Sequence, residues 1–349
     1  MTIARDDPAA LAAAPDAGLK RRRARRLALA ALAVFALALP FGASGYHLFQ
    51  FSQVLIYAIA LLGLNILTGY NGQISLGHGA FYAIGGYASA ILMTKFGFPY
   101  WATLPFAGLI CFGAGFLFGL PALRLGGLYL ALATFALAVA TPQLLNYKGF
   151  DAWTGGSGGL QLGKPHAPFG LPLTSDQWLY LVCLACAGLL FWAASNLVGG
   201  RVGRAIVAIR DQPVAAETMG VNIAFYKATC FGVSALYAGV AGALGAIVVG
   251  FVSPDSFGLF LSLSLLVGIV VGGLASIRGV LFGALFIEFV PNFADQLSDL
   301  FGESAKALPG AIYGVLLIGF MALLPSGVAG ALAAAPRRLA RLFSRPGPV

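Results

Sequence analysis

The amino-acid sequence predicts an all-α integral membrane protein with about ten transmembrane helices, some of them short or interrupted, and both termini in the cytoplasm. Hydrophobic residues make up 59 % of the chain and charged residues only 9 %, and the mean hydropathy is +0.88. These values exclude an ordinary soluble globular domain. The 47 glycines favour close packing between helices in lipid.

Apolar runs of near-spanning length follow one another along almost the whole chain. The candidate spans are 27–43, 50–69, 75–94, 99–120, 127–145, 178–198, 227–250, 259–276, 279–296 and 308–325. Several are shorter than a perpendicular helix requires, so some should be broken or lie between neighbours. This divides the chain into a basic tail over 1–26 that we expect to be disordered, a transmembrane domain over 27–325, and a second basic tail over 326–349.

The basic residues predict the orientation, because short cytoplasmic loops are enriched in Lys and Arg. With both termini inside, only Lys95, Lys148, Lys164 and Lys306 of the 21 basic residues fall outside. The loop 146–177 is then external and the loop 199–226 cytoplasmic. The Lys20–Arg26 cluster before the first apolar run also resembles a signal peptide. The run is long for a cleaved signal, which favours an uncleaved first span.

Other uses of the charge and of the cysteines are excluded or disfavoured. The net charge of +9 is spread over short loops and tails and forms no basic face for nucleic acid. Cys183 and Cys186 form a C-x-x-C pair inside an apolar run, where small buried apolar residues are the expected role. Gly163-Lys164 is followed by Pro165, so this glycine-rich stretch is not a P-loop. No cofactor or metal site is expected.

The most polar internal stretch is 199–220, GGRVGRAIVAIRDQPVAAETMG. It predicts one short helix over Arg204–Arg210 and a second that Asp211 caps, with Pro213 in its first turn and Gly220 as its end. Such a helix could be gripped by a soluble partner. A basic loop that only fixes the topology is the alternative on composition alone.

A second unusual stretch, 64–81, places polar side chains among glycines between two apolar runs. Its candidates for lining a translocation pathway are Asn65, Asn71, Gln73, Ser75 and His78. Irregular backbone in a membrane is tolerated where it is buried in protein or lines a wet cavity. A tightly packed cytoplasmic turn explains the pattern equally well, and a lone histidine such as His78 is more often a packing residue than a ligand.

Glu288 is the acidic residue near the middle of the span 279–296. A charge there is costly and should face the bundle interior or a polar partner. It is a candidate point on the pathway, and a packing role across helices is the other interpretation.

The chain resembles the LivM-type permease subunits of branched-chain amino acid ABC importers. The resemblance rests on LNILTGYNGQISLGHGAFYAIGGY at 64–87 and GRAIVAIRDQPVAAETMGVNIAFYK at 203–227, and covers about 50–325. Shorter matching blocks are LRLGGLYLALATFAL at 123–137, TGGSGGL at 154–160 and VVGGLASIRGVLFGALF at 270–286.

This resemblance implies a non-hydrolytic pore subunit in a bacterial inner membrane. It implies a second, LivH-like permease, two ATP-binding subunits and a periplasmic solute-binding protein as partners. The implied substrates are leucine, isoleucine and valine, although similar sequences handle urea, short amides or aromatic acids. The residues implied to couple to the ATPase are Arg204, Arg210, Asp211, Ala215, Ala216, Glu217 and Gly220. The rival functions are a secondary transporter driven through Glu288 and, with little support, a membrane enzyme.

Overall fold

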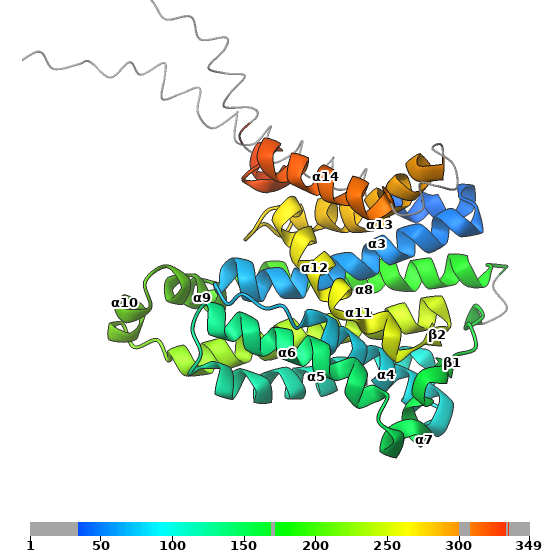
Figure 1. The fold of residues 1–349 in the computed structure, drawn as a ribbon, viewed down its shortest axis with the longest axis horizontal. Coiled ribbons are helices and arrows are strands. Elements are labelled where there is room, and N and C mark those ends of the chain that lie inside the picture. Colours follow the sequence, from blue (N-terminus) through cyan, green and yellow to red (C-terminus); the bar gives the residue numbers. More distant parts are fainter. Residues whose placement is uncertain (1–33, 169–171, 300–307, 333, 335–349) are drawn as a thin grey trace, which may run out of the picture.

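The computed structural model describes residues 34–168, 172–299, 308–332 and 334. It is a bundle of long helices that lie side by side (Figure 1), with a two-residue ribbon as the minor β component. The main helices are α3 (Gly45–Leu64), α4 (His78–Phe96), α5 (Tyr100–Ala122), α6 (Leu128–Leu145), α8 (Ser175–Gly199), α11 (Ile223–Val249), α12 (Leu259–Gly272), α13 (Gly279–Asp299) and α14 (Leu308–Leu323).

The described part of the chain contains eight helices that are long and apolar enough to cross a membrane. This confirms the all-α membrane class. The helix α4 is not among them, because it carries His78, Lys95 and three glycines, yet it packs inside the bundle. Residues 34–42 are helical and belong to the first expected span. The rest of that span, and both basic tails, lie outside the described residues.

The centre of the bundle is α11, of whose most apolar stretch 83 % of the residues are buried. Small residues let neighbouring helices approach it closely. A Cβ at Gly85 of α4 would meet the backbone of Gly239 of α11, and one at Gly115 of α5 would meet Ala235. The close approach of α4 and α5 to α11 therefore depends on glycine at these positions.

The chain departs from α-helical structure between α3 and α4. After α3 the backbone widens into the π-helical turn η1 (Asn65–Tyr70), and 71–77 then runs without regular structure before α4 begins at His78. Side chains of Asn71, Gln73 and Ser75 are buried. The polar stretch is therefore an interrupted segment in which buried polar side chains alternate with the exposed Gly72 and Ile74.

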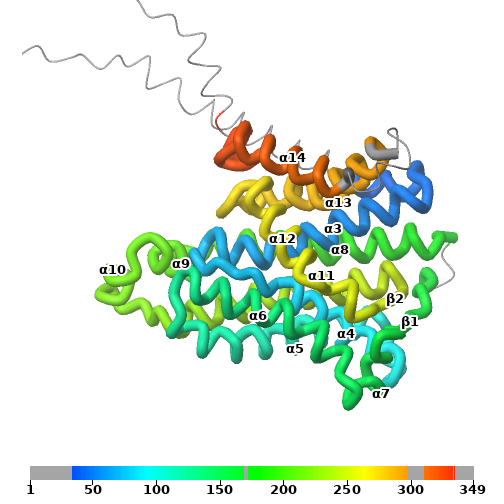
Figure 2. The backbone as a smooth tube through the Cα atoms, in the orientation of Figure 1, coloured from blue at the N-terminus to red at the C-terminus, as the bar shows by residue number. Residues whose placement is uncertain are grey.

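Two small structures close the opposite ends of the bundle (Figures 1 and 2). One end carries α9 (Arg201–Asp211) and α10 (Pro213–Thr218). The other carries η2 (Lys148–Phe150), α7 (Asp151–Thr154), η3 (Gly156–Gly158), η5 (Pro254–Phe257) and the antiparallel pair of β1 (Leu160–Gln161) with β2 (Phe251–Val252). The ends correspond to the loops that the charge pattern assigns to opposite sides of the membrane.

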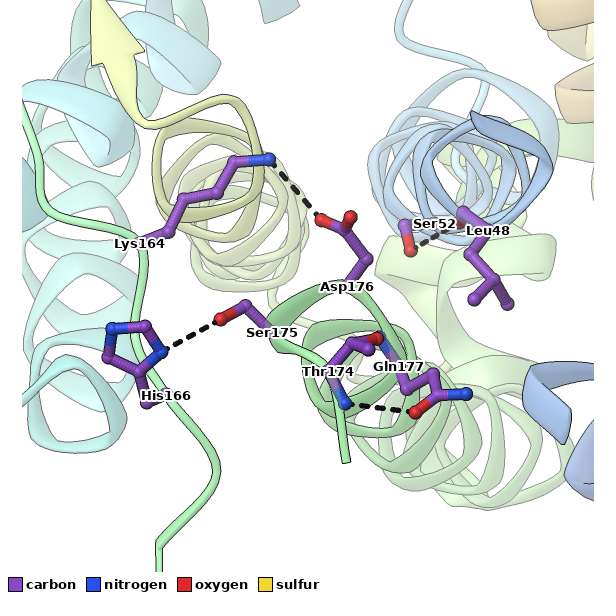
Figure 3. Close-up of polar contacts among 8 residues, drawn as sticks. All are labelled: Leu48, Ser52, Lys164, His166, Thr174, Ser175, Asp176 and Gln177. Atoms are coloured by element: carbon purple, nitrogen blue, oxygen red, sulfur yellow. Dashed lines mark hydrogen bonds and ion pairs between the residues drawn. The ribbon is translucent and has the colours of Figure 1, made fainter. Parts of the chain in front are cut away.

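Polar contacts connect Lys164 and His166 to the start of α8 (Figure 3). Thr174 and Gln177 form a reciprocal capping box at the start of the helix. Lys164 pairs with Asp176 at 3.3 Å, and the Ser175 hydroxyl lies 3.1 Å from Nδ1 of His166. These contacts join the strand-bearing loop to the first turn of α8.

The four cysteines are free thiols in the helices of the bundle. Cys111, Cys183 and Cys230 are buried and Cys186 is half-buried. They occupy small apolar positions in the packing, as the sequence indicated.

Candidate translocation and coupling site

The helices α9 and α10 form a bent pair at one end of the bundle. The buried face of α9 consists of Gly203, Ile206 and Ile209, and its other face is exposed. The bend falls at Gln212, and Pro213 is the first residue of α10, where its missing N–H is not needed. Gly220 then turns the chain with a φ of +83°. The expected roles of Pro213 and Gly220 are confirmed.

The expectation that Asp211 caps the second helix is wrong. Gln212 precedes α10, and it makes no side-chain capping bond. The carboxylate of Asp211 instead accepts a hydrogen bond of 2.8 Å from Nε of Arg210. A neighbouring guanidinium offers a charge-assisted bond, and this outweighs a single backbone N–H.

Most of the residues that the sequence assigned to ATPase coupling are open to a partner. Arg204, Asp211, Ala215, Glu217 and Gly220 are exposed, whereas Ala216 is buried against the bundle. A hollow of about 600 Å³ lies beside them, lined in part by Glu217, Gly220 and Lys227.

Two apolar side chains on α10 and its end are also exposed, and the site residues inferred from the sequence did not include them. Val214 is 73 % exposed and Met219 is 85 % exposed. Large apolar residues that stay in water at the tip of a polar loop are typical of a contact surface. The signal was present in the sequence, because both residues interrupt an otherwise polar or small-residue stretch.

Arg210 differs from these residues because its side chain also reaches into the bundle. Its Nη1 donates a hydrogen bond of 2.8 Å to the carbonyl oxygen of Gly69, in η1. Its stem lies against Gly72, where a Cβ would come within 2.8 Å of Cγ of Arg210. Arg210 therefore joins the α9–α10 pair to the interrupted segment.

Asn65 clamps the interrupted segment to the turn between α12 and α13. Its Oδ1 accepts from the backbone N–H of Ala275 at 2.9 Å, and its Nδ2 donates to the carbonyl of Ser276 at 3.1 Å. Ala275 has a φ of +56°, the sole positive φ of a non-glycine residue in the described chain. The bidentate contact holds this left-handed alanine in place.

His78 and Ser75 form a closed hydrogen-bond chain in the bundle. Ser234 of α11 donates its hydroxyl proton to the carbonyl of Gly63 at 2.6 Å, so it accepts from Nε2 of His78 at 2.5 Å. Nδ1 of His78 is then the acceptor for the Ser75 hydroxyl at 3.1 Å. This assignment describes a neutral histidine whose two nitrogens are both satisfied.

Two further contacts anchor the start of α4. The backbone N–H of Leu76 donates to Thr134 of α6, and that of Gly79 donates to Ser262 of α12, each at 2.9 Å. Ser234 is the twelfth residue of α11, roughly 16 Å along that helix from its start at 1.5 Å per residue. The helix α4 therefore begins inside the bundle, well away from its end.

The polar residues of this segment fall into two groups. Asn65, Ser75 and His78 have protein partners and hold the backbone. Asn71 and Gln73 are 2 % and 7 % exposed, and both polar atoms of the Asn71 side chain and Oε1 of Gln73 have no hydrogen-bond partner among the described residues. Buried amides without partners are costly, so the second group is the one available to a ligand or water.

Glu288 does not join this cluster. Its side chain is half-buried in α13 and interacts electrostatically with Tyr57 of α3, while its backbone carbonyl accepts from Nδ2 of Asn292 at 2.7 Å. Its neighbour Phe289 packs edge-on against Phe51. Glu288 therefore lies in the contact between α13 and α3.

The fold and the site define a multi-pass membrane protein with an interrupted central segment and a short, exposed helix pair at one end of the bundle. The family described as "Branched-chain amino acid transport system / permease component" matches residues 46–322. The chain belongs to this family.

Two curated relatives are each 37 % identical over 319 residues, which covers 84 % of this chain and 73 % of the relative. Both are described as the "High-affinity branched-chain amino acid transport system permease protein LivM", one from Salmonella typhimurium strain LT2 and one from Escherichia coli strain K12.

Proposed function

We propose that this protein is a membrane-spanning permease subunit of an ATP-driven importer for branched-chain or related neutral amino acids. The observation that carries the proposal is Arg210, which connects an exposed helix pair to the polar interrupted segment through a hydrogen bond of 2.8 Å to Gly69. An exposed docking element with a direct contact to the pathway is what a pump driven by a separate ATPase needs. The family membership supports the same function.

The remaining machinery belongs to partners. The family resemblance supports a second, LivH-like permease that completes the pathway and two ATP-binding subunits, one of which docks on α9–α10. It also supports a periplasmic binding protein that delivers the solute at the β1–β2 end. The chain itself then hydrolyses no ATP, and its place is the bacterial inner membrane. Arg204, Asp211, Ala215, Glu217 and Gly220 form the outer contact surface with Val214 and Met219, while Arg210 and Ala216 fix the pair to the bundle.

The coupling works through backbone movement. When the ATPase subunits close, α9–α10 is displaced and Arg210 carries this displacement to Gly69. Asn65 extends it to the turn at Ala275, and the 71–77 stretch extends it to His78. Because η1 and 71–77 lack a continuous α-helical hydrogen-bond ladder, they can shift while breaking fewer backbone hydrogen bonds than a regular helix would.

Uptake of labelled leucine tests this function. The permease pair, the ATPases and the binding protein are reconstituted in proteoliposomes with ATP on the ATPase side. We expect leucine to accumulate, and excess valine and isoleucine to compete while urea and benzoate do not. If valine and isoleucine both fail to compete, the solute belongs to another class.

A further inference from the structure

A polar pocket of about 240 Å³ lies where α9–α10 meets the interrupted segment. Its walls come from 71–74, from the turn between α5 and α6 with the start of α6, from Ile209 to Pro213, and from α11. It opens at the end of the bundle that carries the basic residues Arg124, Arg201 and Arg204. By the charge pattern this end is cytoplasmic.

Two cationic side chains line the pocket. Lys227 of α11 makes no hydrogen bond or ion pair with any described residue. Arg210 uses Nε for Asp211 and Nη1 for Gly69, which leaves N–H groups of its guanidinium for another acceptor. The pair of cations favours a carboxylate in the pocket.

The unpartnered amides of Asn71 and Gln73 lie in the same wall. Their carbonyl oxygens are acceptors, and a terminal amide rotates in a broad energy minimum, so both can turn toward a ligand. An ammonium group is a triple donor that would satisfy them. A simple anion would leave these two oxygens without a partner, because an amide oxygen only accepts hydrogen bonds, and among these unpartnered buried atoms only Nδ2 of Asn71 could donate to it.

The rest of the lining is aliphatic. Ile74, Leu125, Leu130 and Ile209 contribute to it, and Ile74 and Leu125 are 47 % and 37 % exposed. An aliphatic side chain in the pocket would remove this apolar surface from water. Cations, neutral acceptors and an aliphatic wall together match the three parts of a zwitterionic aliphatic amino acid.

We infer that this pocket binds a free aliphatic amino acid at the cytoplasmic mouth, with its carboxylate at Lys227 and Arg210 and its ammonium at Asn71 and Gln73. This site rests on the proposed function and extends it: the transported solute, once released, occupies a site between the docking helices and the pathway. A molecule bound there joins α9 to the 71–74 wall and holds them together. Cytoplasmic amino acid therefore slows further import.

Binding of labelled leucine to the assembled transporter in nanodiscs, without binding protein, tests the site. We expect Lys227→Gln and Gln73→Leu each to weaken binding by about tenfold or more, the loss typical of a charge-assisted hydrogen bond. Lys227→Arg should retain binding. Arg124→Gln, which removes a charge at the same end without lining the pocket, should bind like the wild type.

Competition distinguishes the chemistry of the ligand. Leucinol lacks the carboxylate and 4-methylpentanoate lacks the ammonium, so neither should displace leucine at a concentration where isoleucine does. Equal competition by 4-methylpentanoate or by inorganic phosphate would make this an anion site and overturn the inference. Unchanged leucine binding in Lys227→Gln and Gln73→Leu would also overturn it.

Thiol labelling places the ligand in the pocket. A Cβ at Gly126, in the pocket wall, and one at Gly199, at the same end but outside the lining, would each meet no atom within 4 Å. In a cysteine-free background, leucine should slow maleimide labelling of Gly126→Cys and leave Gly199→Cys unchanged. Equal rates with and without leucine contradict the site.

Uptake measured in parallel separates the two proposals. If leucine uptake is at the wild-type level but no leucine binds at the pocket, the proposed cytoplasmic site is contradicted and the proposed function is not. If no ATP-driven leucine uptake is observed, the proposed function itself is contradicted.

Discussion

The guanidinium of Arg210 donates a hydrogen bond to the carbonyl of Gly69 across 2.8 Å, between residues 141 positions apart in the chain. The contact links the exposed α9–α10 pair to the π-helical turn η1. A π-helical turn has carbonyls outside the usual α-helical ladder and recurs at functional sites. The bond is therefore placed where a small movement of α9 changes the backbone of the proposed pathway.

Arg210→Gln should uncouple the transporter. Glutamine is too short to reach Gly69 and carries no charge, while the exposed face of α9–α10 is unchanged. We expect normal recovery of ATPase subunits with the permease but about a fivefold to tenfold fall in leucine transported per ATP hydrolysed, the effect of losing one charge-assisted bond. Arg124→Gln is the control. Reduced ATPase recovery would instead place Arg210 in the docking surface itself.

Gly69→Ala should destabilise the protein through one methyl group. The new Cβ would collide with Oδ1 of Asn65 and lie 2.5 Å from the backbone nitrogen of Ala275, so the clamp on that turn must open. We expect a loss of about 1–3 kcal/mol, read as a lower midpoint of thermal unfolding in detergent. Gly188→Ala, in the open surface of α8, should raise or keep the midpoint. Equal midpoints for the two variants would contradict the clamp.

His78→Ala should weaken the bundle without a change in charge. The side chain is 1 % exposed, and its removal leaves a cavity and takes a partner from Ser75 and Ser234. The expected cost is about 2–5 kcal/mol. His47→Ala, at an exposed position in α3, should cost little. If His78 were a ligand for the solute alone, the variant would keep its stability and lose only transport.

The docking surface can be tested by changing its outer side chains. Met219→Asp removes an exposed apolar contact, and Glu217→Lys reverses a charge beside it. Neither residue supports the bundle, since both are exposed, so both variants should insert and fold normally. We expect each to reduce copurification of the ATPase subunits by about tenfold. Ile110→Asn, at an exposed position near the middle of α5, would by contrast not affect ATPase recovery.

The sequence predicted the helices because apolar runs of spanning length are a strong signal, and it located the polar stretch 64–81 for the same reason. The sequence could not show which of these polar residues have hydrogen-bond partners within the protein. The partners of Asn65 and His78 lie 210 and 156 residues away, and no local pattern encodes such contacts. The cap assigned to Asp211 failed because local propensity omits the competing guanidinium of Arg210. The sequence also could not show that Glu288 lies apart from the polar residues of 64–81. That separation follows from the packing of α13 against α3, which hydrophobic periodicity alone does not predict.

Dependence of uptake on the ATPase subunits is the most direct test of the account. Proteoliposomes with the permease pair and binding protein are prepared with and without the ATPases, with ATP on the cytoplasmic side, and challenged with labelled leucine. The account predicts accumulation only when ATPases and ATP are both present, and none from an imposed proton gradient. Accumulation driven by that gradient without ATPases, and abolished by Glu288→Gln, would contradict it and identify a secondary transporter.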